Sequence, residues 1–346
     1  MAGPAKGTPA VHGGDTADDA VARGRPGLLV LHELVAPIVG QLSDDFTIHD
    51  ASQAADLSGF LATIPAHEVV AIASLGRDGC DRSLIDRLPA LKIICAIGAG
   101  VEEIDLAAAR ARGIPVTNAG SGNSRDVGDH AAVLWLAFRN QIEAGRAWIT
   151  QDRWRREGLM PSRRSLGSER VGIVGLGNIG MVAATRAAAF GAEVAWWGPN
   201  PKPAAPWPRH ASLLQLAHWA TTLIVAARGG DDSRNLIDGA VMDALGPDGL
   251  LVNVARGFMV DEEVMIARLR SGALGGAALD VFADEPAGPE RWRDVPNLLM
   301  TPHAAALTQE AGQQLYRTFL DNLRTALTGA PPVNVVNGAL PMVASA

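Results

Sequence analysis

The sequence has few cysteines, and this scarcity limits the chemistry that it can contain. Cys80 and Cys95 are the only two among 346 residues, too few for a disulfide framework or a thiolate metal site. Cys95 lies inside an apolar run, where an inert thiol is the favoured interpretation. We therefore expect no metal ion, and the cysteine usage suits the reducing environment of the cytoplasm.

The chain also lacks an excess of positive charge and any long apolar run. Its formal net charge is −7, with acidic and basic residues interspersed, so it has neither a basic stripe for nucleic acid nor a polybasic patch for a membrane. No uncharged apolar run approaches the length that spans a bilayer, and residues 1–14 lack the hydrophobic segment of a signal peptide. A small molecule is therefore the expected partner.

Glycine and aliphatic residues are abundant by contrast. The sequence contains 38 glycines and is 48% hydrophobic, which is typical of a large α/β core with glycine turns, and its length favours two domains. Residues 1–25 are rich in Gly, Ala, Pro and Asp without periodicity, and they are predicted to form a mobile tail. Beyond them, apolar runs alternate with helical patterns, an order that predicts parallel sheets.

The first predicted domain comprises residues 26–122 and 306–346, the second segment containing a long helical pattern that returns the chain to it. Its strands are expected in short apolar or alternating runs: 28–31, 46–49, 69–73 and 91–97. The last of these runs opens into Gly98-Ala99-Gly100. Strand ends of this kind carry ligands in open α/β sheets, so the turn is a candidate ligand contact.

The second predicted domain comprises residues 123–305. Its strands are apolar runs with helical patterns between most of them: 171–175, 193–197, 222–227, 249–255, 275–282 and 297–302. Residues 148–164 are basic and aromatic without a regular period, and they are expected to form a surface arm. The predicted fold class is α/β, with two Rossmann-like doubly wound parallel-sheet domains and an active-site cleft between them.

A glycine-rich turn organises the second domain. The strand 171–175 runs into Gly175-Leu176-Gly177-Asn178-Ile179-Gly180 and then directly into a helical pattern. In a phosphate-binding turn, Gly175 allows the tight turn, Gly177 lets a pyrophosphate approach the backbone, and Gly180 lets the helix pack against the sheet. The amides at the start of that helix would face the phosphates. A purely structural turn is the alternative, but the flanking strands favour dinucleotide binding.

Arg256, Glu285 and His303 each follow a hydrophobic run of the second domain. The carboxyl ends of strands are where an open α/β sheet positions its ligands. Alone, each residue has an ordinary alternative: a surface ion pair, a proline turn or a strand cap. Together they supply a guanidinium that can hold a carboxylate or carbonyl, a carboxylate, and a proton donor.

These segments closely resemble the D-isomer-specific 2-hydroxyacid dehydrogenases, a family that includes glyoxylate, hydroxypyruvate and hydroxyphenylpyruvate reductases and phosphoglycerate dehydrogenase. The resemblance extends over residues 28–330. Four motifs occur in the order and spacing of the family: 175–180, 253–261, 279–286 and 301–303. The resemblance implies NAD(P)H-dependent reduction of a small 2-oxo acid, of the glyoxylate/hydroxypyruvate or arylpyruvate type, to the D-2-hydroxy acid. It also implies that the first domain binds substrate and the second binds the dinucleotide.

The resemblance implies roles for individual residues as well. Arg256 would orient the 2-oxo acid, His303 would be the acid/base catalyst, and Glu285 would support it. Backbone amides at Ala99 and Gly100 would bind the substrate carboxylate. The residues implied to contact the dinucleotide are Gly175, Gly177, Asn178, Ile179, Gly198, Asn200, Lys202, Arg228, Ala255, Asp280 and His303. By the same analogy, we expect a homodimer formed through the dinucleotide-binding domains.

One segment departs from the NAD-preferring members of the family. Where those relatives carry an Asp after the second strand of the dinucleotide-binding domain, this chain has Gly198. No acidic residue occurs from 194 to 230, whereas Lys202, Arg209 and Arg228 are basic. An acid there would repel a 2′-phosphate, so its absence favours NADP(H), with NAD(H) as the alternative. Lys202 and Arg209 could also merely solvate a proline-rich loop.

Two other functions are alternatives to the reductase. The first is a dinucleotide-sensing binding protein similar to the C-terminal-binding-protein corepressors, which would use the same fold, although nothing in the tail indicates a partner groove. The second, a formate dehydrogenase, is disfavoured because the motif around Glu285 has the 2-hydroxyacid form. The remaining histidines, including His130 and His218, are interpreted as structural or surface residues.

Overall fold

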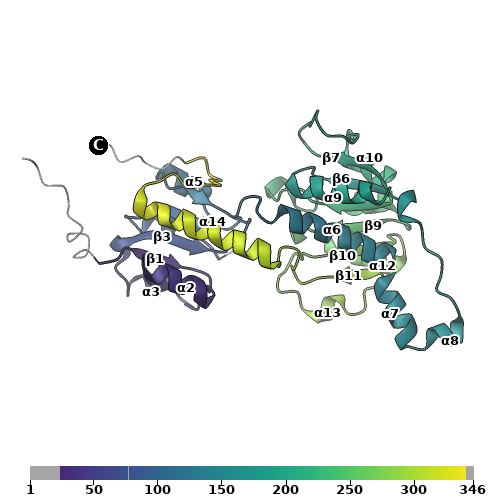
Figure 1. Ribbon diagram of the computed structural model, residues 1–346, viewed down its shortest axis with the longest axis horizontal. Coiled ribbons are helices and arrows are strands. Elements are labelled where there is room, and N and C mark those ends of the chain that lie inside the picture. The colour runs from purple at the N-terminus through teal and green to yellow at the C-terminus, as the bar shows by residue number, and fades with distance from the viewer. Residues whose placement is uncertain (1–23, 77, 340–346) are drawn as a thin grey trace, which may run out of the picture. The chain divides into compact units, whose positions relative to one another are not determined.

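The computed structural model describes residues 24–76 and 78–339. The predicted tail at 1–25 therefore lies outside the described residues, apart from residues 24 and 25. The chain divides into two compact units (Figure 1). Unit 1 takes in the described parts of 1–119 and 316–346, and unit 2 takes in 120–315.

The sheet of unit 1 consists of five strands that all run parallel. They are β1 (Gly27–Val30), β2 (Thr47–Asp50), β3 (Val69–Ser74), β4 (Ile93–Ala96) and β5 (Val116–Thr117). The order β2-β1-β3-β4-β5 means that the chain first moves to one side of β1 and then to the other. This reversal defines a doubly wound sheet.

Helices cover both faces of this sheet, because its central strands are buried on both sides and need an apolar partner on each. One face packs against α2 (Ala36–Ser43) and α14 (Gln309–Thr328). The opposite face packs against α3 (Leu57–Leu61), α4 (Arg82–Asp86) and α5 (Leu106–Ala111). The helices of unit 1 carry these labels in Figure 1, where there is room for them.

The sheet of unit 2 has six strands, and these are also all parallel. They are β6 (Arg170–Val174), β7 (Glu193–Trp197), β8 (Thr222–Val225), β9 (Leu250–Asn253), β10 (Gly276–Leu279) and β11 (Leu298–Met300). Their order is β11-β10-β9-β8-β6-β7, with the reversal between β6 and β8. The predicted α/β class with two doubly wound parallel sheets is therefore confirmed.

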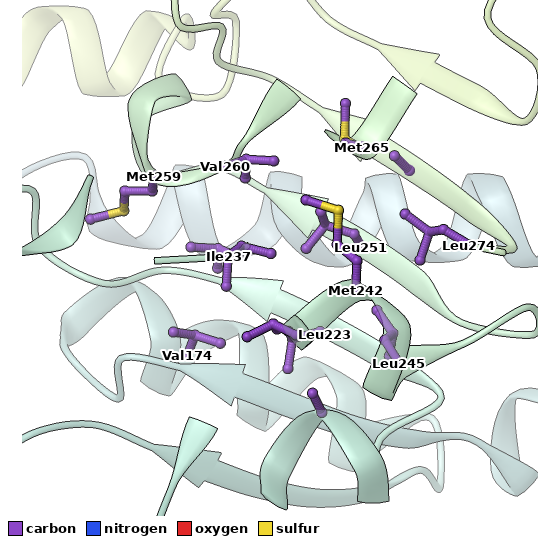
Figure 2. Packing of buried hydrophobic residues seen from close by; sticks show 14 of the residues in the cluster. Val174, Leu223, Ile237, Met242, Leu245, Leu251, Met259, Val260, Met265 and Leu274 are labelled. Carbon is purple, nitrogen blue, oxygen red and sulfur yellow. The ribbon is translucent and has the colours of Figure 1, made fainter. Parts of the chain in front are cut away.

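Two groups of helices enclose the sheet of unit 2. On one face lie α6 (Ser124–Arg139) and α9 (Asn178–Ala189), and on the other lie α10 (Leu213–Trp219), α11 (Gly239–Leu245) and α12 (Glu262–Ser271). Figure 2 shows the second layer from within: Met242 and Leu245 of α11 and Met265 of α12 meet Leu223 and Leu251 of the strands. The short helix α13 (Pro289–Trp292) follows β10.

Several helices begin at an aspartate whose carboxylate accepts a hydrogen bond from the backbone N–H three residues later. The caps are Asp81, Asp105, Asp238 and Asp261, with distances of 2.8, 2.7, 2.9 and 3.2 Å. A cap of this kind contributes about 1 kcal/mol, because it satisfies an amide that has no partner within the helix. The local sequence therefore fixes where these helices start.

The predicted surface arm, 148–164, contains no buried residue, and part of it is helical. The end of α7 (Ile142–Thr150) and all of α8 (Arg153–Glu157) lie within it. Local contacts stabilise the segment: the guanidinium of Arg153 bonds to the carboxylate of Glu157 one turn later and stacks 3.7 Å from the ring of Trp148. The indole N–H of Trp148 also donates to the Gly158 carbonyl. Contacts of this kind, between side chains one turn apart, stabilise a helix without hydrophobic periodicity.

Both cysteines are free and buried, and burial raises the pKa of each thiol to about 12. This environment agrees with the predicted inert role of Cys95. Among the described residues, no group of three or more His, Cys, Asp or Glu side chains could hold a metal ion. Within 24–76 and 78–339, no helix has the length and apolar character needed to cross a membrane.

Candidate active site

Most of the predicted site residues lie at the carboxyl ends of the strands of unit 2. Because all six strands are parallel, these ends form one edge of the sheet, with neighbours about 4.8 Å apart. Along this edge the residues follow the order of the strands: His303 after β11, Asp280 after β10, Arg256 after β9, Arg228 after β8, the glycine turn after β6, and Gly198 to Lys202 after β7.

His303 and Glu285 form a direct pair. Nδ1 of His303 lies 2.7 Å from Oε2 of Glu285, a distance at which the ring N–H donates to the carboxylate. Half of the His303 side chain is exposed, against one fifth of the Glu285 side chain. Since Nδ1 is engaged by Glu285, Nε2 is the ring atom that can exchange a proton with a ligand.

Glu285 is held by its own turn as well. Its Oε1 accepts a hydrogen bond from the backbone N–H of Phe282 at 3.0 Å. The two carboxylate oxygens therefore have different partners. Oε1 binds the backbone of the turn, and Oε2 faces the imidazole of His303. The structure confirms that these two residues lie together, while their catalytic roles remain a prediction.

The backbone at His303 has an unusual conformation, with φ at +50°. A non-glycine residue in this left-handed region costs on the order of 1–3 kcal/mol, so the surrounding structure must hold it in place. The N–H of His303 donates to the carbonyls of Asp280 and Thr301 at 2.8 and 3.0 Å. The next two amides, of Ala304 and Ala305, donate to the Asp280 carboxylate at 2.8 and 3.0 Å.

Asp280 is the centre of this network. Its side chain is 1% exposed, and it also accepts from the Thr301 hydroxyl at 2.6 Å. Burial alone would raise the pKa of Asp280, but the hydrogen bonds from His130, Thr301, Ala304 and Ala305 outweigh burial and lower it. Asp280 thus stays ionised and holds the turn that carries His303. Its predicted contact with a nicotinamide remains a prediction.

His130 is a residue of the site whose connection the sequence did not reveal. It lies on α6, with Nε2 3.0 Å from the Thr301 hydroxyl and 3.5 Å from Oδ1 of Asp280. The expectation of a structural histidine agrees with this position. Its partners are 150 or more residues away in the chain, so no local signal could have identified them.

Arg256 follows β9 in extended conformation, and its guanidinium donates to the Ala255 carbonyl at 2.8 Å. The side chain of Asn253 braces this turn, because it donates to the Arg256 carbonyl and accepts from the Ala255 amide. The next residue, Gly257, packs so closely that an added Cβ would lie 1.8 Å from the carbonyl carbon of Phe282. The Arg256 turn therefore abuts the turn that carries Glu285.

The glycine turn has the shape that a pyrophosphate requires. Gly175 has φ of +89°, and a Cβ there would lie 2.5 Å from Cα of Ala227 on the neighbouring strand end. A Cβ on Gly180 would lie 2.1 Å from the Gly175 carbonyl oxygen, so α9 approaches the turn closely. Around Gly177, by contrast, no described atom beyond its two chain neighbours lies within 4 Å of such a Cβ. Asn178 and Ile179 begin α9, whose free amides face this open space.

The segment after β7 contains Gly198, Asn200 and Lys202, of which only Gly198 is buried. Arg209 donates through Nη2 to the Gly198 carbonyl at 2.7 Å, so it braces this turn instead of only solvating the loop. Lys202 and Arg228 are exposed. The residues present fit a nucleotide with an extra phosphate, since the turn offers cations and no carboxylate.

The predicted substrate turn lies in unit 1, after β4. The carbonyl of Gly98 accepts from the Ala119 amide at 2.9 Å, and the carbonyl of Ala99 accepts from the Asn118 side chain at 2.7 Å. A Cβ on Gly76 would lie 2.0 Å from the Gly100 carbonyl oxygen. Neighbouring strand ends therefore hold Ala99 and Gly100 in a fixed conformation.

Comparison with known proteins decides the family. A family model described as "D-isomer specific 2-hydroxyacid dehydrogenase, NAD binding domain" matches residues 132–305. The chain belongs to the D-isomer-specific 2-hydroxyacid dehydrogenases. The resemblance inferred from the four motifs is therefore confirmed, and the matched residues contain the glycine turn and all three predicted catalytic residues of this dehydrogenase.

Relatives extend the match beyond that domain. A 2-ketogluconate reductase of Gluconobacter oxydans (strain 621H) is 34% identical over 299 residues, or 86% of this chain and 94% of the relative. A glyoxylate/hydroxypyruvate reductase of Arabidopsis thaliana is 33% identical over 291 residues, or 84% and 89%. A crystal structure of an NADPH-dependent glyoxylate/hydroxypyruvate reductase from Sinorhizobium meliloti, in complex with NADP and malonate, matches with a TM-score of 0.82, 32% identity, and coverage of 93% and 100%. This dehydrogenase thus shares both units of its fold with an enzyme solved with NADP.

The glycine turn yields a matched pair of substitutions. Gly180→Ala should lower the free energy of unfolding by about 1–3 kcal/mol and weaken NADPH binding, because its methyl group would clash with the Gly175 carbonyl. Gly177→Ala should leave the melting temperature near that of the wild type, yet weaken NADPH binding, because the methyl group would occupy the space for the pyrophosphate. Calorimetry and fluorescence titration measure the two effects. Wild-type affinity in Gly177→Ala would show that no phosphate approaches there.

Proposed function

We propose that this dehydrogenase reduces a small 2-oxo acid to the D-2-hydroxy acid with NADPH. The observation that carries the proposal is the His303–Glu285 pair at 2.7 Å, on the same sheet edge as Arg256 and the glycine turn. A proton donor, an anion-binding guanidinium and a phosphate cradle are the three groups that such a reduction needs. The names of the relatives agree with this reaction.

The residues divide the chemistry between them. When bound, the nicotinamide supplies the hydride that reaches the 2-oxo carbon. His303 gives its Nε2 proton to the developing alkoxide, while Glu285 orients the ring through Nδ1 and stabilises its charged form. Arg256 binds the carbonyl and carboxylate of the substrate with its planar guanidinium and stabilises the negative charge as it forms.

The proposed substrate class rests on the names of the relatives and on the turn at Ala99 and Gly100. The relatives are named for 2-ketogluconate, glyoxylate, hydroxypyruvate and hydroxyphenylpyruvate, which share the 2-oxo acid group. We propose that backbone amides at Ala99 and Gly100 bind the carboxylate of this group. The hydrogen bonds to the carbonyls of Gly98 and Ala99 support the proposal, because they fix the turn in advance of binding.

The corepressor-like alternative receives no support from the comparisons, since the relatives named above are reductases. The catalytic pair is also complete, which a protein that only senses a dinucleotide does not require. We further propose that the protein is cytoplasmic, in keeping with two buried free thiols.

We propose a homodimer formed through unit 2. A segment that includes part of α6 and the arm exposes large apolar side chains, each with 55% or more of its surface accessible: Val133, Ile142, Ile149, Trp154 and Leu159. Exposed apolar groups gathered on one segment favour burial against a partner. The contacts of Trp148 and Arg153 keep the arm ordered, so a second copy would meet a preformed surface.

The first functional prediction concerns the proton. The value of kcat/KM for reduction should be flat at acid pH and fall at higher pH, because reduction uses the imidazolium of His303. Glu285→Gln removes the charge that stabilises this form, so the break should move to lower pH. His303→Asn should abolish the break and reduce the rate by a factor on the order of 10²–10⁴. An unmoved break in Glu285→Gln would remove the carboxylate from this role, and near-normal turnover of His303→Asn would remove the histidine.

The second concerns the cofactor. The value of kcat/KM with NADPH should exceed that with NADH by at least about tenfold, or roughly 1.4 kcal/mol. Gly198→Asp should reverse the order, since a carboxylate there repels the 2′-phosphate and holds the ribose. A Cβ at this position would lie 3.4 Å from the Trp196 ring, an ordinary contact. Gly198→Asn is the control for size, and a preference for NADH in the wild type would overturn the assignment.

The third concerns assembly. Size-exclusion chromatography with light scattering should give twice the mass of one chain for the wild type. The double variant Ile149→Asp/Leu159→Asp should give a single-chain mass, because each substitution buries a carboxylate in the interface. Val333→Asp, at an exposed apolar position of unit 1, is the matched control and should remain dimeric. A wild-type monomer, or a dimer that survives the double variant, would contradict the proposal.

A further inference from the structure

The turn that carries Glu285 rests on a second, buried carboxylate. Oε1 of Glu262 accepts a hydrogen bond from the backbone N–H of Ala283 at 2.6 Å. Oε2 of the same side chain lies 3.1 Å from Nη2 of Arg291. Only 3% of the Glu262 side chain is exposed, although it lies in the first turn of a helix. A glutamate in such a position normally extends into solvent.

We propose that Glu262 is a positioning residue for the His303–Glu285 pair. By binding the amide of Ala283, it fixes the turn so that the Glu285 carboxylate meets Nδ1 of His303. The inference rests on the proposed function only in that the reaction uses this pair.

Two adjacent amides of the turn donate to two different carboxylates. The N–H of Phe282 donates to Glu285 itself, at 3.0 Å, and the N–H of Ala283 donates to Glu262. Without Glu262, the second amide would lose its partner, and the peptide between Phe282 and Ala283 could rotate. That rotation would redirect the chain between Phe282 and Glu285 and so displace the Glu285 carboxylate from the Phe282 amide. The carboxylate that faces His303 therefore depends on both bonds.

Glu262 is itself anchored in the core of unit 2. Asp261 caps the helix α12 by accepting from the Val264 amide, which fixes the first turn. Further along α12, Met265 and Leu269 are buried, and Figure 2 shows Met265 against the strands. The Glu262 side chain thus connects the core of unit 2 to the Glu285 turn.

Other contacts also hold the Glu285 turn in place. Gly257, next to Arg256, packs against the backbone of Phe282 and Ala283. The ring of Phe282 meets Trp292 edge-on at 5.2 Å, and Arg291 lies 5.2 Å from the same indole. Arg291 therefore connects the aromatic side of the turn to Glu262. The turn is thus held by the packing of Gly257, by the contact of Phe282 with Trp292, and by Glu262. Among these three contacts, Glu262 is the one that supplies a charged hydrogen-bond acceptor.

The position is costly for a carboxylate. Burial raises the pKa of Glu262, with Glu263 and Asp284 acting in the same direction, while the Ala283 amide and Arg291 act against it. Burying a charge is unfavourable unless it is paired and hydrogen-bonded. Here both oxygens have partners, and each partner belongs to or borders the catalytic turn. A role in packing alone would not need this charge.

The test uses substitutions at two neighbouring glutamates. Glu262→Ala should lower kcat/KM for reduction by a factor on the order of 10–10², the effect of misplacing a reacting group by about 1 Å. The break in its pH profile should move to lower pH, as in Glu285→Gln. NADPH affinity should stay within about twofold. Glu263→Gln is the control, because Glu263 also contacts Arg291 but is 80% exposed, and it should behave like the wild type.

A double-mutant cycle separates positioning from general stability. If Glu262 acts through Glu285, adding Glu262→Ala to Glu285→Gln should cost less than about twofold more in kcat/KM. Equal loss in both backgrounds, with an unmoved break in Glu262→Ala, would overturn the proposal. Should Glu262→Ala fold poorly, Glu262→Gln is measured in its place, and the same shift is expected to be smaller.

A second measurement does not depend on turnover. In protein with ¹³C-labelled histidine, the His303 ring signal, assigned by its loss in His303→Asn, is titrated without substrate. Its midpoint should be lower in Glu262→Ala than in the wild type and unchanged in Glu263→Gln. A wild type that reduces no 2-oxo acid would refute the proposed function, whereas an unshifted midpoint in Glu262→Ala would refute the role of Glu262.

Discussion

Parallel pairing of all six strands in unit 2 is the constraint on which the site depends. It places every carboxyl end on one edge, so residues from six loops that are distant in sequence become neighbours. The order of the strands therefore sets the order of the predicted site residues along this edge. His303, Glu285 and Arg256 follow the strands on one side, and the segment from Gly198 to Lys202 follows the last strand on the other. The glycine turn follows β6, which lies between these two groups of strands.

Two buried carboxylates bind the turns that carry His303 and Glu285. Asp280 accepts the amides of Ala304 and Ala305 and so holds the turn of His303. Glu262 accepts the amide of Ala283 in the turn of Glu285. In both cases a side chain anchored in the core binds backbone amides of a loop, and the loop presents the reactive group. The protein itself thus holds the imidazole and the carboxylate together. In the proposed reaction, this arrangement would reduce the entropy lost on reaching the reactive geometry.

Much of this arrangement could be predicted from the sequence, because it follows from strand ends. Hydrophobic runs identified the strands. Arg256 and His303 were recognised as candidates because each stands directly after such a run. The sequence predicted the arm as a surface segment but not its helix α8, which depends on a local pair, Arg153 with Glu157. His130 and Glu262 could not be assigned, because their partners lie 21 or more residues away and become neighbours only in the folded sheet. A sequence shows which residues can react, but it does not show which residues hold them.

The left-handed backbone at His303 has a consequence for how this site can change. Asparagine tolerates that conformation better than most residues other than glycine, because its short side chain can bond to the nearby backbone. An exchange of the imidazole for an amide would therefore relax the turn while it removes the proton donor. At this position the backbone can accept either residue, whereas the proposed reaction requires the histidine. Histidine is itself among the non-glycine residues found more often in the left-handed region, so the turn admits the imidazole without a glycine.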